Sequence, residues 1–91
     1  MKKIIIEDKE YELIENSRDC FNEDEFTNLF TDYYYDFDYI LGDYAYSKLR
    51  LKGFYEDNNK KCKDYNKIGN KDKYLERDCA YKCKYFVLKK I

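Results

Sequence analysis

A run of aromatic residues at helical spacing constrains the fold of this chain more than any other feature. In CFNEDEFTNLFTDYYYDF the large apolar side chains recur at steps of three and four residues, as on one face of an α-helix. They are Phe26, Leu29, Phe30, Tyr33, Tyr34 and Phe37. Asn22 and Glu25 form a capping-box pattern, and Phe21 precedes this cap as a staple residue would. The segment predicts a helix at about 22–35 whose aromatic face packs against a sheet.

Alternating apolar and polar residues predict strands on both sides of this helix. KKIIIEDKEYELIEN predicts a hairpin that turns at Asp8-Lys9, and FDYILGDYAYSKLRLKGFY predicts a second hairpin that turns around Gly42-Asp43. A short helix that begins near Asp72 and the apolar segment YFVL complete the pattern. We expect an α+β fold in the order β-β-α-β-β-α-β, with an antiparallel or mixed sheet covered by helices.

The length of the chain limits it to one modest core. With 91 residues it has the size of a single domain, which we expect to span residues 1–91. Only three isoleucines follow the lysines at the start, too few for a secretory signal, and no stretch has the roughly 18 apolar residues of a membrane span. We therefore expect a cytoplasmic protein without membrane contact, whose four cysteines are reduced.

The net charge of −1 conceals two oppositely charged halves. Residues 1–46 carry four Lys or Arg against thirteen Asp or Glu, whereas residues 47–91 carry fourteen against six. These halves either neutralise each other within the fold, which we favour, or present an acidic and a basic face to different partners.

The second predicted hairpin carries the candidate binding surface. On its returning strand, alternate residues place Lys48, Arg50 and Lys52 on one face, about 6–7 Å apart. Cations beside exposed aromatic rings suit an RNA, and a charged strand suits a protein partner equally well. A solvated strand face is the ordinary alternative. The candidate surface comprises Asp43, Tyr46, Lys48, Arg50, Lys52 and Tyr55.

Catalytic patterns are missing from the sequence. The chain contains no histidine, which excludes a cysteine–histidine or serine–histidine centre, and its three glycines are too far apart for a phosphate-binding loop. Cys79 and Cys83 are four residues apart and could bind zinc with Cys20 and Cys62, or exchange electrons. Burial on the core face of the last helix fits their spacing better. We expect no enzymatic activity and no cofactor, with zinc as the alternative.

Two separated motifs, DYILGDYAYSKLRLKGF and YLERDCAYKCKYFVLKK, resemble the YutD-like family of small bacterial proteins. The residues that carry the resemblance are Gly42, Asp43, Tyr46, Leu49, Arg50, Leu51, Lys52, Gly53, Phe54, Cys79, Cys83, Tyr85 and Phe86. Tyr44 stands where such proteins often have tryptophan, and Lys82 stands where they often have glycine. The resemblance implies a compact intracellular α+β domain, and it implies no particular activity.

These observations predict a non-enzymatic interaction module that binds a protein or an RNA through its basic strand and the adjacent loop after Glu56. The alternative is a cysteine-dependent protein that holds structural zinc or performs thiol redox chemistry.

Overall fold

The computed structural model of the chain describes residues 2–6, 8–45, 48–63, 66–78 and 84–91. The strands are β1 (Lys2–Ile6), β2 (Lys9–Asn16), β3 (Tyr39–Ala45), β4 (Lys48–Phe54) and β5 (Tyr85–Lys90). The α-helices are α1 (Glu23–Leu29) and α2 (Lys71–Asp78), and short 3-10 helices are η1 (Ser17–Asp19), η2 (Asp32–Asp36) and η4 (Ile68–Asn70). The predicted α+β class and the order β-β-α-β-β-α-β are confirmed.

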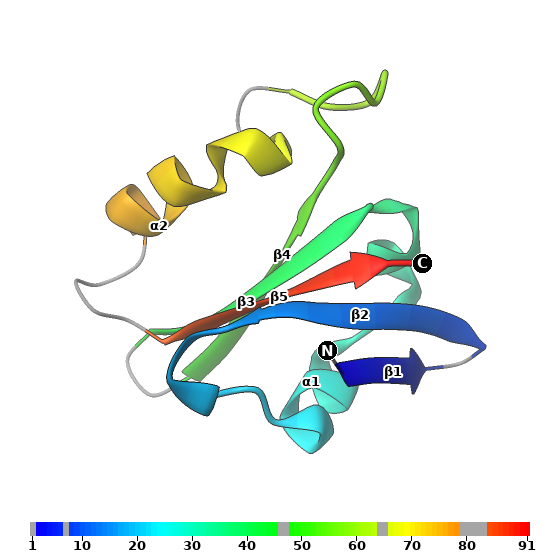
Figure 1. Ribbon diagram of the computed structural model, residues 1–91, viewed down its shortest axis with the longest axis vertical. Helices are drawn as coiled ribbons and strands as arrows, with labels where there is room; N and C mark the ends of the chain where they lie inside the picture. Colours follow the sequence, from blue (N-terminus) through cyan, green and yellow to red (C-terminus); the bar gives the residue numbers. More distant parts are fainter. Residues whose placement is uncertain (1, 7, 46–47, 64–65, 79–83) are drawn as a thin grey trace.

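The five strands form one antiparallel sheet in the order β1-β2-β5-β3-β4. The C-terminal strand β5 therefore lies in the middle of the sheet, between β2 and β3 (Figure 1). This position explains why YFVL is continuously apolar, since Phe86, Val87 and Leu88 are all fully buried. Phe86 and Leu88 belong to one core cluster and Val87 to another, so β5 joins two cores on opposite faces of the sheet.

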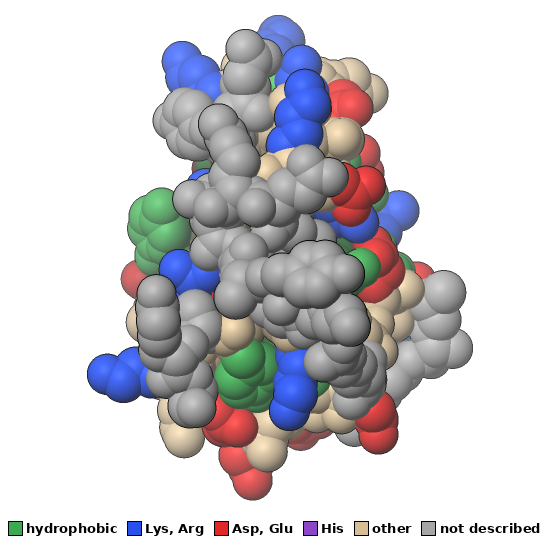
Figure 2. All heavy atoms as spheres, turned by 90° about the vertical axis from the view of Figure 1, so that its left-hand side faces the viewer, with side chains coloured by type: hydrophobic (Ala, Val, Ile, Leu, Met, Phe, Trp, Pro, Cys, Tyr) green, Lys and Arg blue, Asp and Glu red, His purple; other side chains and the backbone are tan. Residues whose placement is uncertain are grey.

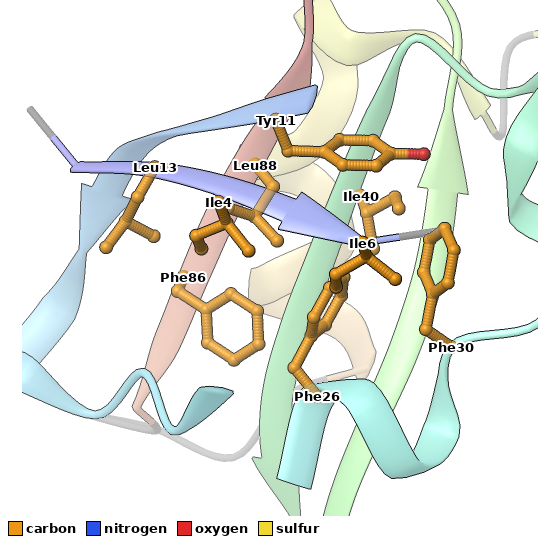
Figure 3. Close-up of a cluster of buried hydrophobic side chains, with 9 residues drawn as sticks. All are labelled: Ile4, Ile6, Tyr11, Leu13, Phe26, Phe30, Ile40, Phe86 and Leu88. Atoms are coloured by element: carbon orange, nitrogen blue, oxygen red, sulfur yellow. The ribbon is translucent and has the colours of Figure 1, made fainter. Parts of the chain in front are cut away.

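The larger core lies between α1 and the sheet. Phe26 and Phe30 reach from the α1 segment toward Tyr11, Ile40 and Phe86 on the strands (Figure 3). The smaller core, on the opposite face, contains Tyr39, Leu41, Phe54 and Val87, against which Ile68 and Tyr74 pack from the side of α2. Figure 1 shows α1 and α2 on different sides of the sheet. Neither described helix is long and apolar enough to cross a membrane.

The aromatic segment is less regular than the sequence predicts. The start of the helix is as expected, because the Asn22 side chain accepts the Glu25 N–H at 3.0 Å and the Phe21 and Phe26 rings lie 5.9 Å apart. However, α1 ends at Leu29, and Phe30 has extended backbone angles. The chain resumes as η2, and this break lets Phe37 reach the sheet and lie over Gly53. The prediction of one helix over 22–35 is therefore wrong.

Gly42 and Asp43 do not form the predicted turn. Both lie within β3, where Gly42 pairs with Leu51 and Asp43 pairs with Arg50 across the hairpin. Gly42 has negative φ and needs no special backbone conformation there. Its role is spatial, because a Cβ at this position would lie 2.2 Å from Cζ of Phe86. The glycine makes room for the buried ring of the central strand.

Candidate functional site

An ion pair between Asp43 and Arg50 lies at the centre of the predicted binding surface. The Arg50 Nε donates to Asp43 Oδ1 at 3.0 Å and its Nη2 donates to Oδ2 at 2.9 Å, which is a bidentate contact. The Asp43 side chain is only 1% exposed, whereas that of Arg50 is 44% exposed. The Tyr74 hydroxyl from α2 donates to the same carboxylate at 3.4 Å. Asp43 is thus a support for Arg50, and Arg50 offers only part of its surface to a partner.

Lys48 and Lys52 flank Arg50 on the same strand. Lys48 is exposed, and Lys52 is partly covered because its Nζ lies 5.5 Å from the ring centroid of Phe54 and 5.4 Å from that of Tyr74. Such contacts hold a cation over a ring face while its outer side remains in water. The structure therefore keeps the predicted row of cations together on the α2 side of β4. Tyr46 lies outside the described residues.

Tyr55 lies apart from this row and belongs to a second polar cluster. Its hydroxyl donates to Asp36 Oδ2 at 2.7 Å, and Lys61 Nζ lies 2.7 Å from Oδ1 of the same carboxylate. The hydrogen bond from Lys61, aided by that from Tyr55, lowers the pKa of Asp36. Burial, aided by the contact with Asp36, raises the pKa of Tyr55 to about 12. This cluster ties η2 to the loop after β4.

Ion pairs join the acidic and basic halves of the chain. Asp43 with Arg50, Asp36 with Lys61, and Glu15 with Lys71 each pair an acid from the first half with a cation from the second. This arrangement agrees with internal neutralisation of the two halves. On the face shown in Figure 2, lysine and arginine side chains gather at the top, where the segment after β4 and α2 lie in Figure 1.

A groove of about 770 Å³ runs beside β4. One group of lining residues is aromatic: Tyr33, Tyr34, Phe37, Tyr55 and Tyr74. A second group is cationic: Arg50, Lys52, Lys61 and Lys63. No described lining residue is acidic. A groove with these walls can bind an extended, negatively charged chain, since rings supply apolar area and cations supply charge.

Sequence reasoning missed part of this groove. The helical spacing predicts that Tyr33 and Tyr34 lie on the core face of one helix, yet Tyr33 is 67% exposed. Lys61 and Lys63 belong to a segment predicted only as a loop. The high local density of tyrosine and lysine was the only available signal, because segments far apart in sequence build the walls.

The cysteines give no support for a metal site among the described residues. Cys20 packs against the larger core, where burial raises the pKa of its thiol, and Cys62 donates from Sγ to the Asp57 carbonyl oxygen at 3.3 Å. No group of three or more metal-ligating side chains occurs in the described part of the chain. Cys79 and Cys83 lie outside that part, and zinc binding by them stays a prediction.

The structure shows a small α+β protein with a groove whose described walls are aromatic and cationic. Residues 5–89 match the family model described as "Putative antitoxin YutD-like", and the chain belongs to this YutD-like family. The predicted resemblance is confirmed.

YutD of Bacillus subtilis resembles the chain over nearly its whole length, both in sequence and in structure. The chain is 44% identical over 88 residues to "Putative antitoxin YutD" of Bacillus subtilis strain 168, and the match covers 97% of each chain. It is also similar to the solution NMR structure of protein yutD from B. subtilis, with a TM-score of 0.84 and 43% identity, covering 100% of this chain and 83% of the other.

Proposed function

We propose that this protein is an antitoxin, a non-enzymatic cytoplasmic protein that binds a toxin protein and thereby suppresses its activity. The observation that carries the proposal is the 44% identity to the B. subtilis protein named as a putative antitoxin, over 97% of both chains. The name supplies the class of partner, which neither the fold nor the sequence motifs supply.

The described surface supports a binding role. Lys48, Arg50 and Lys52 lie on one face of β4, and the described residues that line the adjoining groove include cations and no acid. Such a field attracts an acidic partner and accelerates its association. Asp43, although part of the predicted surface, supports Arg50 from within.

A direct test combines capture with growth. The tagged protein is used to capture partners from lysate of its own cells, with and without RNase and at two salt concentrations. A captured protein that survives RNase is then expressed alone and together with this chain. We expect growth arrest in the first case and growth in the second. If RNase removes the whole catch, RNA binding replaces the proposal, and the catch should then also fall steeply with added salt, as counterion release predicts.

A matched pair of charge reversals locates the contact surface. Lys48→Glu changes an exposed cation on β4, and Lys3→Glu makes the same change on β1, at the opposite edge of the sheet. We expect Lys48→Glu to weaken capture and rescue, and Lys3→Glu to leave both unchanged. Equal effects of the two variants would exclude the basic face of β4 as the contact.

A further inference from the structure

The outer edge of β4 offers backbone groups that the sheet does not use. Tyr44 N–H donates to the Lys84 carbonyl oxygen at 3.2 Å, so this residue of β3 bonds toward β5. Backbone polar groups of successive strand residues point to opposite sides, and therefore Tyr39, Leu41 and Asp43 bond toward β4. Their partners on β4 are Phe54, Lys52 and Arg50.

The intervening residues of β4 consequently turn outward. The N–H and C=O groups of Leu49, Leu51 and Gly53 point away from β3, and β4 is an edge strand among the described strands. From Leu49 to Gly53 this edge is about 13 Å long. Leu51 and Gly53 also line the groove beside β4, so part of this edge forms the wall of a recessed site.

The molecule already forms an isolated bridge on the same edge one step further along. Tyr55 N–H donates to the Asn66 carbonyl oxygen at 2.7 Å, and Ile68 N–H donates to the Tyr55 carbonyl oxygen at 2.9 Å. These two bonds form a parallel bridge between Tyr55 and Lys67. The outward groups at Leu49, Leu51 and Gly53 continue this edge in strand geometry, which a further strand could use.

Side chains flank the edge with complementary chemistry. Tyr33 stands on one side, where its ring contacts Tyr34 and Phe37 at centroid distances of 5.1 and 5.4 Å. Lys52 and Lys63 contribute cations to the same groove. An added strand places alternate side chains on opposite faces, so one row would meet the rings and the other would meet the cations.

Charge decides which occupant suits this edge. A second copy of the chain would bring its own Arg50, Lys52 and Lys63 against the same cations, and like charges in paired strands repel. Lysine on an edge strand is a common means of preventing self-pairing. An acidic segment would instead be attracted by Lys52 and Lys63.

We propose that the edge of β4 between Leu49 and Gly53 binds an extended acidic segment of a protein partner as an additional strand of the sheet. This inference rests on the proposed antitoxin function and specifies how the partner is held. Main-chain hydrogen bonds supply affinity that does not depend on the sequence of the bound segment. The cations favour acidic side chains on one face of that segment, and the tyrosine rings favour apolar side chains on its other face.

The test uses a displayed library of random linear heptapeptides, selected on the full immobilised chain. We expect enriched peptides to carry alternate Asp or Glu residues. The strongest peptide, added to the labelled protein, should slow amide hydrogen exchange at Leu49, Leu51 and Gly53. The amides of Arg50, Lys52 and Phe54 should be protected with and without peptide, because they bond to β3.

Charge variants provide the second measurement. Lys52→Glu combined with Lys63→Glu should weaken peptide binding about tenfold, and Lys3→Glu should leave it unchanged. No enrichment, enriched peptides without acids, protection at β1 instead of β4, or unaltered binding by the double variant would each overturn the inference. So would a dimer in sedimentation whose contact protects the same β4 amides. A partner captured from lysate equally well by wild type and double variant would leave the antitoxin proposal standing without this mode of binding.

Discussion

Asp43 and Arg50 face each other across the β3–β4 hairpin as a bidentate ion pair whose acidic member is buried and whose basic member is 44% exposed. The pair is therefore unequal. Water can replace Asp43 around the guanidinium, but it cannot replace Arg50 around a carboxylate that is 1% exposed. Removing Arg50 leaves the buried Asp43 carboxylate without a counter-charge. This change should therefore cost more stability than removing the charge of Asp43.

We therefore expect Arg50→Met to lower the free energy of unfolding by about 2 kcal/mol, below the full cost for a buried pair because Arg50 is partly exposed. Asp43→Asn keeps a hydrogen-bonding side chain and should cost about 1 kcal/mol. Urea unfolding measures both. Lys48→Met, an exposed cation on the same face, serves as the control and should change stability by less than about 0.5 kcal/mol. A larger loss for Asp43→Asn than for Arg50→Met would contradict this account.

Gly42 should tolerate no side chain while Phe86 occupies its present place. A Cβ on Gly42 would lie between 2.2 and 2.7 Å from three atoms of the buried Phe86 ring. Gly42→Ala should therefore destabilise the protein by about 3 kcal/mol, which thermal unfolding would detect. Adding Phe86→Leu to Gly42→Ala should cost less than the sum of the two single changes, because the smaller side chain makes room. Simple additivity of the two costs would show that the ring is not the obstacle.

Local patterns in the sequence were sufficient to predict the beginning of α1 and the strands. Asn22 caps the helix as its spacing from Glu25 predicts, because a cap needs only neighbouring residues. The alternation in KEYELIEN likewise predicts β2. Fold class and element order follow from such signals together with length.

The remaining features depend on contacts between distant residues. Gly42-Asp43 has the residue types of a turn, yet it lies within a strand. A glycine is needed at position 42 because the ring of Phe86, forty-four positions later, occupies the space of a Cβ. The groove beside β4 joins η2, the strand edge and the loop after it, so no single segment predicts it. The row of cations could be predicted because it follows from alternation along one strand. The burial of Asp43 could not be, because it depends on Tyr74 from α2.

Tyr39 and Tyr55 should make the protein less stable in alkali. Burial raises the pKa of each hydroxyl from 10.0 to about 12, aided by Glu56 beside Tyr39 and Asp36 beside Tyr55. Between pH 10 and about 12 the folded state therefore keeps the hydroxyl protons that the unfolded state loses. The stability that these two hydroxyls contribute is complete below pH 10 and is lost as the pH rises through 12. We expect a loss on the order of 2 kcal/mol for each hydroxyl over that interval.

Unfolding in urea at a series of alkaline pH values measures this loss, and tyrosinate absorbance reports the ionisation. Tyr39→Phe and Tyr55→Phe should each flatten the decline, since the hydroxyl that titrates is gone. Ionisation of both hydroxyls at their ordinary pKa of 10.0 would refute the prediction.

Tyr11 presents the opposite case, with a hydroxyl buried in the larger core. The residue is fully buried among the side chains of the larger core (Figure 3). Its hydroxyl oxygen has no hydrogen-bond partner among the described residues. Burying an unpaired hydroxyl costs about 1–3 kcal/mol. The ring of Tyr11, by contrast, stabilises the core, because it packs edge-on against Phe30 with ring centroids 5.7 Å apart. Tyr11→Phe retains the ring and removes only the unpaired group. We expect it to raise the free energy of unfolding by about 1 kcal/mol, measured by urea denaturation.

The same substitution at Tyr39 provides the control. The Tyr39 hydroxyl donates to Glu56 Oε1 at 2.9 Å, so Tyr39→Phe should instead destabilise the protein by about 1 kcal/mol at neutral pH. The opposite signs would separate the effect of an unpaired hydroxyl from any general effect of phenylalanine. A loss of stability in Tyr11→Phe comparable to that in Tyr39→Phe would mean that the Tyr11 hydroxyl has a partner in solution, and the larger core would then contain a satisfied polar contact.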